Sequence, residues 1–362
     1  MALPFAMFMT RGRSLAPPNS LITTDCYVPI VKSRQGELRA LGLLSGDKRT
    51  TLVPLVEVRD TARQGGSLAT AWSDPAHVLF VQPLNFDGRD EQQWAEDVLS
   101  LFDELRNAAV SAVPVATTDD SPAVRAVLAQ VIEQDDRGGC LRLDAEEIAL
   151  ATPAALAAEV DELVGDLGLA ATRCDFVLDV GLVRSSVVAR VATAEAGLRV
   201  VPNIGAWRNL VCAFSAFPEN LSEVAPINNV SQILREDAIA FATLLSRQPE
   251  RDPVYADYCV GFPFYIDSPW IPIPAIRYAV DDSWMVHRGS SRQNRSTQYV
   301  QLASDVVQAP YFAGAGFSPG DRYLADVAVG SDGPGNPMTY VRAATSRHIA
   351  CVLDRLANHG VP

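Results

Sequence analysis

The sequence predicts an α/β fold of the (β/α)8 class, TIM-barrel-like, with insertions after the seventh and eighth strands. From residue 27 onward, short runs that are apolar on both faces alternate with helical patterns, as expected for a parallel sheet covered by helices. Eight strands can be placed in this way, and a chain of 362 residues is long enough for such a barrel. An open doubly wound sheet shares the local pattern and is the alternative. Its dinucleotide-binding form is disfavoured because no GxGxxG segment follows the first strand.

The strands are predicted from short apolar runs bounded by polar or turn-forming residues. The first six are Tyr27–Val31, Thr51–Glu57, Val78–Gln82, Ala112–Ala116, Cys140–Asp144 and Asp175–Asp179. The run Leu198–Asn203 is predicted as the seventh strand. The eighth is predicted in one of two segments, Asp257–Gly261 or Ala275–Ala279.

The helix predicted over Glu91–Val110 has the clearest periodicity. Trp94 and Val98 begin an apolar stripe along one face, and acidic residues fill the other face. Ser121 and Thr152 predict the starts of the next two helices, because each is an N-cap residue followed by proline. The remaining helices are predicted at Glu37–Leu44, Ser185–Ala196, Ser231–Ser246 and Thr345–His359.

We expect an N-terminal extension over residues 1–24 and a single barrel-like domain over 25–362, with an insertion at about 205–272. The segment Met1–Thr10 is apolar, but it is short and has no positively charged start, so it does not resemble a signal peptide. No run approaches the roughly 18 apolar residues of a membrane span. Six cysteines lie at least 34 residues apart, which excludes CxxC metal motifs and favours buried free thiols in a reducing cytoplasm.

The negative charge of the chain is concentrated in one sector. The formal net charge is −13, and residues 91–170 contain 17 acidic and four basic residues, whereas the rest of the chain is neutral. Generic binding of duplex DNA is disfavoured, because it requires clustered lysine and arginine. The acidic sector 91–170 is instead a surface on which a basic protein partner could dock.

Polar residues stand at the predicted carboxyl ends of the strands, where the active sites of (β/α)8 barrels lie. The candidate catalytic residues are Lys32, Glu57 and Asp179, and the candidate ligand-binding residues of this set are Gln82, Asp144 and Asn203. Lys32 and Glu57 each follow a proline by three residues on adjacent strands, so we expect them at similar heights and paired. Carboxylates on several strand ends would suit Mg²⁺, but no histidine accompanies them at a fixed spacing, so no metal site is assigned and no cofactor is expected. The alternative is that strand ends are polar only because they adjoin loops.

Two further segments carry basic residues suited to phosphate. Residues 277–295 contain four arginines with serine and glycine between them, and the candidates there are Arg277, His287 and Arg288. The alternative is a solvated basic loop that pairs with the acidic sector. Arg347 and His348 are candidates in the first turn of the last predicted helix, which Thr345 or Ser346 would cap.

Several blocks of the sequence resemble the beta protein family, which is named for a beta protein of T-even phages. The first block is Tyr27–Lys32 with Gly36–Leu38 and Val53–Glu57, and later blocks are Pro274–Tyr278, His287–Gly289, Gly335–Pro337 and Ser346–His348. The resemblance covers roughly residues 25–358 and implies a setting in phage–host conflict. It supplies no catalytic residues.

Two functions from different classes follow. The first is a barrel that binds a phosphorylated ligand, a nucleotide or a nucleic-acid end in a polar cleft, with phosphoester hydrolysis as its reaction. The second is a non-catalytic protein–protein interaction component of an antiviral system. The distance between Lys32, Glu57 and Arg277 discriminates them, because the first function requires these residues to share one cleft.

Overall fold

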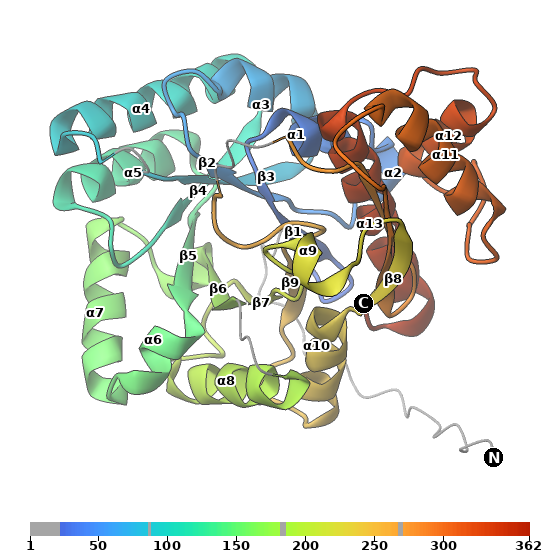
Figure 1. Ribbon diagram of the computed structural model, residues 1–362. Helices are drawn as coiled ribbons and strands as arrows, with labels where there is room; N and C mark the ends of the chain where they lie inside the picture. The colour runs from blue at the N-terminus through green and yellow to red at the C-terminus, as the bar shows by residue number, and fades with distance from the viewer. Residues whose placement is uncertain (1–21, 86–87, 182–185, 267–270) are drawn as a thin grey trace.

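A computed structural model describes residues 22–85, 88–181, 186–266 and 271–362 (Figure 1). Eight parallel strands form a closed barrel, and the last of them pairs with the first. In order around the barrel they are β1 (Tyr27–Lys32), β2 (Leu55–Val58), β3 (Val78–Pro83), β4 (Ser111–Ala116), β5 (Gly139–Asp144), β6 (Cys174–Gly181), β7 (Asn209–Phe214) and β9 (Val254–Asp257). The predicted (β/α)8 class is confirmed, and the open doubly wound alternative is wrong because the sheet closes.

Helices follow the strands and cover the outside of the barrel (Figure 1). They are α1 (Gln35–Gly42), α2 (Gly46–Arg49), α3 (Gly65–Ala71), α4 (Glu91–Asn107), α5 (Pro122–Asp135), α6 (Ala145–Leu150), α7 (Pro153–Asp166), α8 (Val187–Val200) and α10 (Glu236–Ser246), with a 3-10 turn at Ala171–Arg173. The two predicted caps are confirmed. The Ser121 side chain accepts from the backbone N–H of Val124, and the Thr152 side chain accepts from that of Ala155.

The seventh and eighth strands differ from the prediction. Leu198–Asn203 is not a strand, because its first residues form the last turn of α8, and Leu198 is buried against the helix layer. Short apolar runs have no periodicity that separates a buried strand from a helix end. The seventh strand is β7 and the eighth is β9, which overlaps the first predicted alternative only at Asp257.

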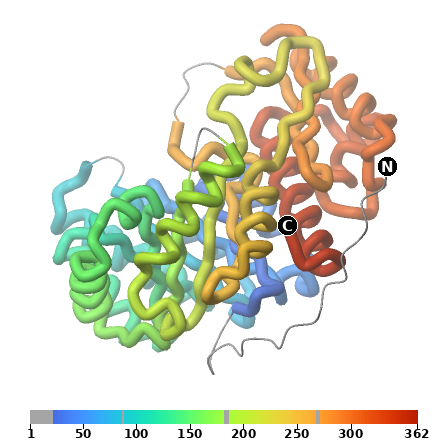
Figure 2. The backbone as a smooth tube through the Cα atoms, turned by 90° about the horizontal axis from the view of Figure 1, so that it is seen from below, coloured from blue at the N-terminus to red at the C-terminus, as the bar shows by residue number. Residues whose placement is uncertain are grey.

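The second alternative, Ala275–Ala279, is a strand of a different sheet. This strand, β10 (Ala275–Ala279), pairs antiparallel with β11 (Ser283–Arg288), which pairs with β8 (Asn229–Leu234). The sheet, together with α11 (Arg295–Gln308), α12 (Pro319–Ala328) and α13 (Pro337–His359), forms a lobe beside the barrel (Figures 1 and 2). The short helix α9 (Leu221–Val224) precedes β8. The insertion predicted at about 205–272 therefore contains the barrel strands β7 and β9 as well as residues of the lobe.

Two predicted helices begin elsewhere. Helix α10 begins at Glu236 and not at Ser231, because the preceding residues pair with β11 as β8. Helix α13 begins at Pro337, where Asn336 and Thr339 form a capping box, and so neither Thr345 nor Ser346 caps it. This helix packs against α1 and β10 and thereby joins the lobe to the barrel.

The core has an inner and an outer layer, because successive strand residues point to opposite faces. Inside the barrel lie residues such as Ile30, Leu55 and Phe80, and between strands and helices lies a larger layer that contains Leu101 and Leu128. All six cysteines are free and buried, as predicted. Among the described residues, no helix has both the length and the apolar character required to cross a bilayer.

Candidate functional site

The uppermost inward-facing positions of the barrel are polar, although the layers beneath them are apolar. These positions belong to β1, β2, β3, β5 and β6 and to the residue that follows β9. Their side chains are Lys32, Glu57, Gln82, Arg142, Asp179 and Tyr258. Each strand residue of this set lies two residues beyond an apolar residue of the barrel interior, for example Ile30, Leu55 and Cys140. The alternation of the strands therefore places these polar groups together at the carboxyl end of the barrel.

Arg142 is the centre of this polar layer. Its Nη1 donates to Oε1 of Glu57 at 2.9 Å and also to the amide oxygen of Gln82. Its Nε and Nη2 donate to Oδ2 of Asp179 at 2.9 and 2.7 Å. Nη2 also donates to the hydroxyl of Tyr258, which in turn donates to Asp179. One guanidinium thus links four strands and the end of a fifth, and its planar array of donors suits this better than a lysine would.

The backbone at the end of β6 orients Asp179. The strand register shifts between Asp179 and Gly181, and the N–H of Gly181 donates to Oδ1 of Asp179 at 2.9 Å. Gly181 has a φ of 57°, a left-handed conformation that glycine adopts without steric cost. This bulge leaves Oδ2 to face Arg142 and Tyr258.

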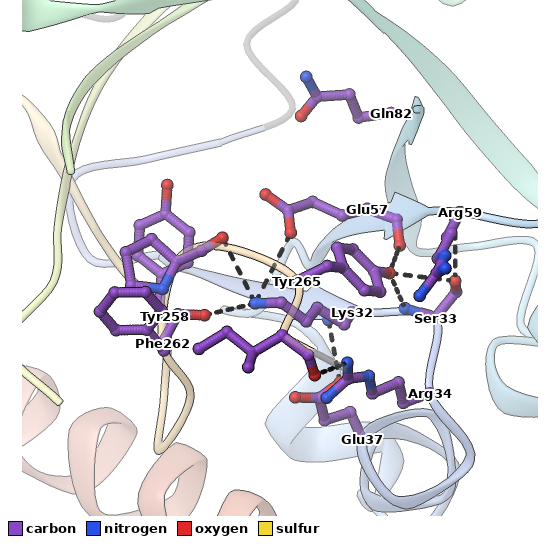
Figure 3. Close-up of polar contacts among 12 residues, drawn as sticks. Lys32, Ser33, Arg34, Glu37, Glu57, Arg59, Gln82, Tyr258, Phe262 and Tyr265 are labelled. Carbon is purple, nitrogen blue, oxygen red and sulfur yellow. Dashed lines mark hydrogen bonds and ion pairs between the residues drawn. The ribbon is translucent and has the colours of Figure 1, made fainter. Parts of the chain in front are cut away.

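Lys32 occupies the side of the layer beneath residues 262–265, which we call the roof loop (Figure 3). Its Nζ lies 3.9 Å from Oε2 of Glu57 and donates to the backbone oxygens of Phe262 and Pro263. The Tyr265 hydroxyl donates to the backbone oxygen of Glu57 at 2.8 Å, which ties the roof loop to β2. The predicted pairing of Lys32 with Glu57 is present in the structure.

Burial and charge pairing act together on the pKa values of this layer. Burial alone would lower the pKa of Arg142, but Tyr258, Asp179 and Glu57 outweigh it and raise that pKa well above its usual value. Burial lowers the pKa of Lys32, and Glu57 offsets part of this. Burial raises the pKa of Tyr258 well above its usual value. Within the layer, two cations face two carboxylates, so buried charge is compensated.

An acidic cleft opens above Arg142. It has a volume of about 490 Å³, and the roof-loop residues Phe264 and Tyr265 form part of its wall. Its carboxylates are Glu57, Asp119, Asp144, Glu146, Glu147 and Asp179. Asp144 stands on the rim, where it caps α6 by accepting from the N–H groups of Glu146 and Glu147. Because Arg142 already bridges Glu57 and Asp179, it occupies the place that a cation between these carboxylates would take.

A second pocket of about 310 Å³, the cationic pocket, shares Phe264 with the acidic cleft. Lys32, Arg34 and Arg277 line it, together with the first turn of α1. The N-cap residue of α1 is Arg34, whose side chain makes no cap hydrogen bond, and residues 34–37 of this first turn line the pocket. Burial raises the pKa of Glu37, in the same turn, to about 7 even though Lys32 and Arg34 lie nearby.

Three predicted catalytic residues and one predicted ligand residue meet at this end of the barrel. Lys32, Glu57, Asp179 and Gln82 are joined through Arg142 and each other. Asn203 does not join them, since it lies in the turn that precedes β7 and hence at the opposite end of the barrel. Its placement at a strand end was wrong because the strand itself was misplaced.

The predicted phosphate segment 277–295 divides between different environments. Arg277 reaches the cationic pocket, donates to the backbone oxygen of Val260 at 2.9 Å and stacks on Phe217. His287 is buried in the lobe beside the Tyr311 hydroxyl, and burial lowers its pKa. Arg288 donates to the backbone oxygens of Leu221 and Ala225. The register of β10 and β11 puts Arg277 and Arg288 on one face of the sheet and His287 on the other, and only Arg277 of the three lines the cationic pocket, so they do not form one phosphate loop.

Arg347 and His348 lie in the middle of α13 and not in its first turn. Arg347 is buried between Tyr278 and Phe317, and its Nε lies 3.8 Å from Asp321. Neither residue lines the acidic cleft or the cationic pocket.

His348 belongs to a buried cluster centred on Asp257. Asp257, Cys259 and His348 are close enough to share a metal ion. The carboxylate of Asp257 already accepts from His348 at 2.8 Å and from the hydroxyls of Tyr27 and Tyr255. These donors satisfy it without a metal, and the cluster fastens α13 to the barrel.

Sequence reasoning missed Arg142, Tyr258 and Glu37. Arg142 was detectable, because it is the polar residue at an inward-facing position of an otherwise apolar strand, two residues after Cys140. Tyr258 lies inside the predicted strand Asp257–Gly261 and so did not stand at a predicted strand end, and Glu37 resembles any acidic residue in a first helical turn.

The residues of this site lie within a stretch of sequence that matches a known protein family. A family model described as Beta protein matches residues 27–354, which include all eight barrel strands and most of the lobe. The chain belongs to the beta protein family. The match includes the residues of the polar layer, the acidic cleft and the cationic pocket. No curated protein matches this chain.

Proposed function

We propose that this member of the beta protein family binds a small phosphorylated ligand at the carboxyl end of its barrel. The observation that supports this most strongly is that Lys32 from β1 and Arg277 from β10 line one pocket. Arginine is well suited to phosphate oxygens, and the uncapped start of α1 adds N–H donors and the positive end of a helix dipole. The phosphate group occupies the cationic pocket.

The rest of the ligand extends past Phe264 into the acidic cleft. Phe264 lines both cavities and is 64% exposed, so its ring is available for contact with a planar group such as a nucleobase. The carboxylates around the cleft accept hydrogen bonds from hydroxyl or amino groups. A nucleotide or a nucleic-acid end, with a phosphate, a planar base and hydroxyl or amino groups, fits these two adjoining cavities better than an apolar ligand does.

Calorimetry with nucleoside monophosphates and sugar phosphates tests the proposal. We expect Arg277→Ala to weaken binding at least tenfold, which corresponds to about 1.4 kcal/mol and is within the range of one charge-assisted hydrogen bond. Arg322→Ala is the matched control, since it removes an exposed arginine on α12 that lines neither cavity. Binding that survives Arg277→Ala unchanged overturns the proposal.

The reaction and the setting belong to the same proposal. Release of inorganic phosphate, or of an alcohol and a phosphate monoester, from a bound phosphoester would establish phosphoester hydrolysis. Lys32, Glu57 and Asp179 are the residues to vary. The setting in phage–host conflict predicts that phage plating on cells with the Arg277→Ala variant differs from plating on cells with the unaltered protein. Equal plating efficiency on the two kinds of cells would overturn the proposed role in phage–host conflict but not the proposed binding site.

A further inference from the structure

The cationic pocket contains a carboxylate among its cations, and this requires an explanation if the pocket receives an anion. Glu37 lines the pocket between the arginines and Lys32. Its Oε2 accepts from the backbone N–H of Lys32 at 3.1 Å. Its Oε1 lies close to the backbone of Gly261, where the Cβ of any larger residue would come within 3.7 Å of it. One carboxylate oxygen is therefore held by the backbone of β1, and the other faces the glycine-lined wall of the pocket.

We propose that Glu37 is a ligand-binding residue that acts as a neutral acid. Its carboxyl donates a hydrogen bond to an oxygen of the bound oxyanion, and binding takes up from solvent the proton that an ionised Glu37 lacks, so that uptake approaches one proton per ligand as the pH rises. This inference rests on the proposed function, because it concerns the anion that the cationic pocket holds. It also narrows the ligand class to anions with a deprotonated oxygen that can accept a hydrogen bond from a carboxylic acid.

Electrostatics favours this protonation. An ionised Glu37 would place a carboxylate against the incoming anion in a site partly withdrawn from water, where like charges repel strongly. A protonated Glu37 removes that repulsion and adds a donor. The raised pKa, about 7, means that the proton is available close to neutrality.

The charged groups that face Glu37 come from several elements of the fold. Lys32 and Arg34 favour its ionised form, whereas Glu57 favours its neutral form. Arg277 interacts with it across the pocket, and Glu219 lies on the rim. Lys32 also has a lowered pKa, so a test must separate its titration from that of Glu37.

Sulfate is the probe of choice, because it stays fully ionised between about pH 5.5 and about pH 8.5 and any proton uptake then belongs to the protein. If only protonated Glu37 binds, a pKa of about 7 predicts an affinity about 30-fold lower at the upper end of this range than at the lower end. Calorimetry in buffers of different ionisation enthalpy measures the proton taken up. Glu37→Gln keeps the acceptor for the Lys32 N–H and supplies an amide donor, so it should bind sulfate with nearly constant affinity over this range.

Asp120→Asn is the matched control. Burial raises the pKa of Asp120 to about 6, but its carboxylate accepts from the backbone N–H of Thr117 and does not line the cationic pocket. It should retain the pH dependence of the unaltered protein. If Glu37→Gln also retains that dependence, the inference is overturned while the proposed function stands. If the unaltered protein binds no sulfate at the acidic end of the range, or binds it equally after Arg277→Ala, both are overturned.

Discussion

The ion pair between Arg142 and Asp179 should contribute far more to stability than an exposed pair of the same kind. Their side chains are only 10% and 11% exposed, and two nitrogens of the guanidinium reach the same carboxylate oxygen. Removing Arg142 would leave both Asp179 and Glu57 without their main cation. We expect Arg142→Met, which preserves the length of the aliphatic chain, to lower the free energy of unfolding by about 3–5 kcal/mol.

A double-mutant cycle isolates the pair. It combines Arg142→Met and Asp179→Asn, and we expect a coupling free energy of about 2–3 kcal/mol. The matched control is a cycle on Arg173 and Asp136, whose side chains are 48% and 80% exposed, with an expected coupling below about 1 kcal/mol. Unfolding in urea, followed by far-ultraviolet circular dichroism, measures all the variants, and equal m-values check that the same transition is compared.

The contrast between the two cycles decides whether the reasoning is correct. A coupling between Arg142 and Asp179 no larger than that of the exposed pair would refute it. Such a result would mean that water reaches Arg142 freely, and that the polar layer is then part of the open cleft and not a buried support beneath it.

Four further predictions use other measurements. Glu57→Gln should abolish the biological activity while costing at most about 1–2 kcal/mol of stability, and a fully active variant would leave Glu57 as an ion-pair partner of Lys32 only. The folded-state pKa of Glu37, about 7, lies above its unfolded value, so the contribution of Glu37 to stability falls as pH rises from about 4.5 to about 7. Glu37→Gln should therefore gain stability relative to the unaltered protein across that window. A difference in the free energy of unfolding that stays constant with pH would contradict this. Since all six cysteines are buried, a thiol reagent should label none in the native protein and six after unfolding, and rapid native labelling would count against the packing. The acidic sector 91–170 should prevent retention on duplex DNA, so steeply salt-dependent retention would contradict the electrostatic reasoning.

The sequence by itself determined the barrel class and the first six strands. These strands are short apolar runs between capped helices, and both signals are local, since the length of an apolar run and N-cap chemistry depend on neighbouring residues only. The polar residues at the strand ends could be predicted from the sequence in the same way. Lys32 and Glu57 lie side by side because β1 and β2 pair in parallel, with these two residues in register.

Only the tertiary structure decided where the later strands lie and which residues share a site. The apolar end of α8 and the strand β10 satisfy the same local pattern as a barrel strand, and only barrel closure selects β7 and β9. Arg277 reaches the pocket of Lys32 because the lobe folds back on α1, a contact between distant parts of the chain. The raised pKa of Glu37 arises from burial in that contact. Local sequence specifies periodicity and caps, whereas burial and charge pairing depend on what long-range packing brings near each group.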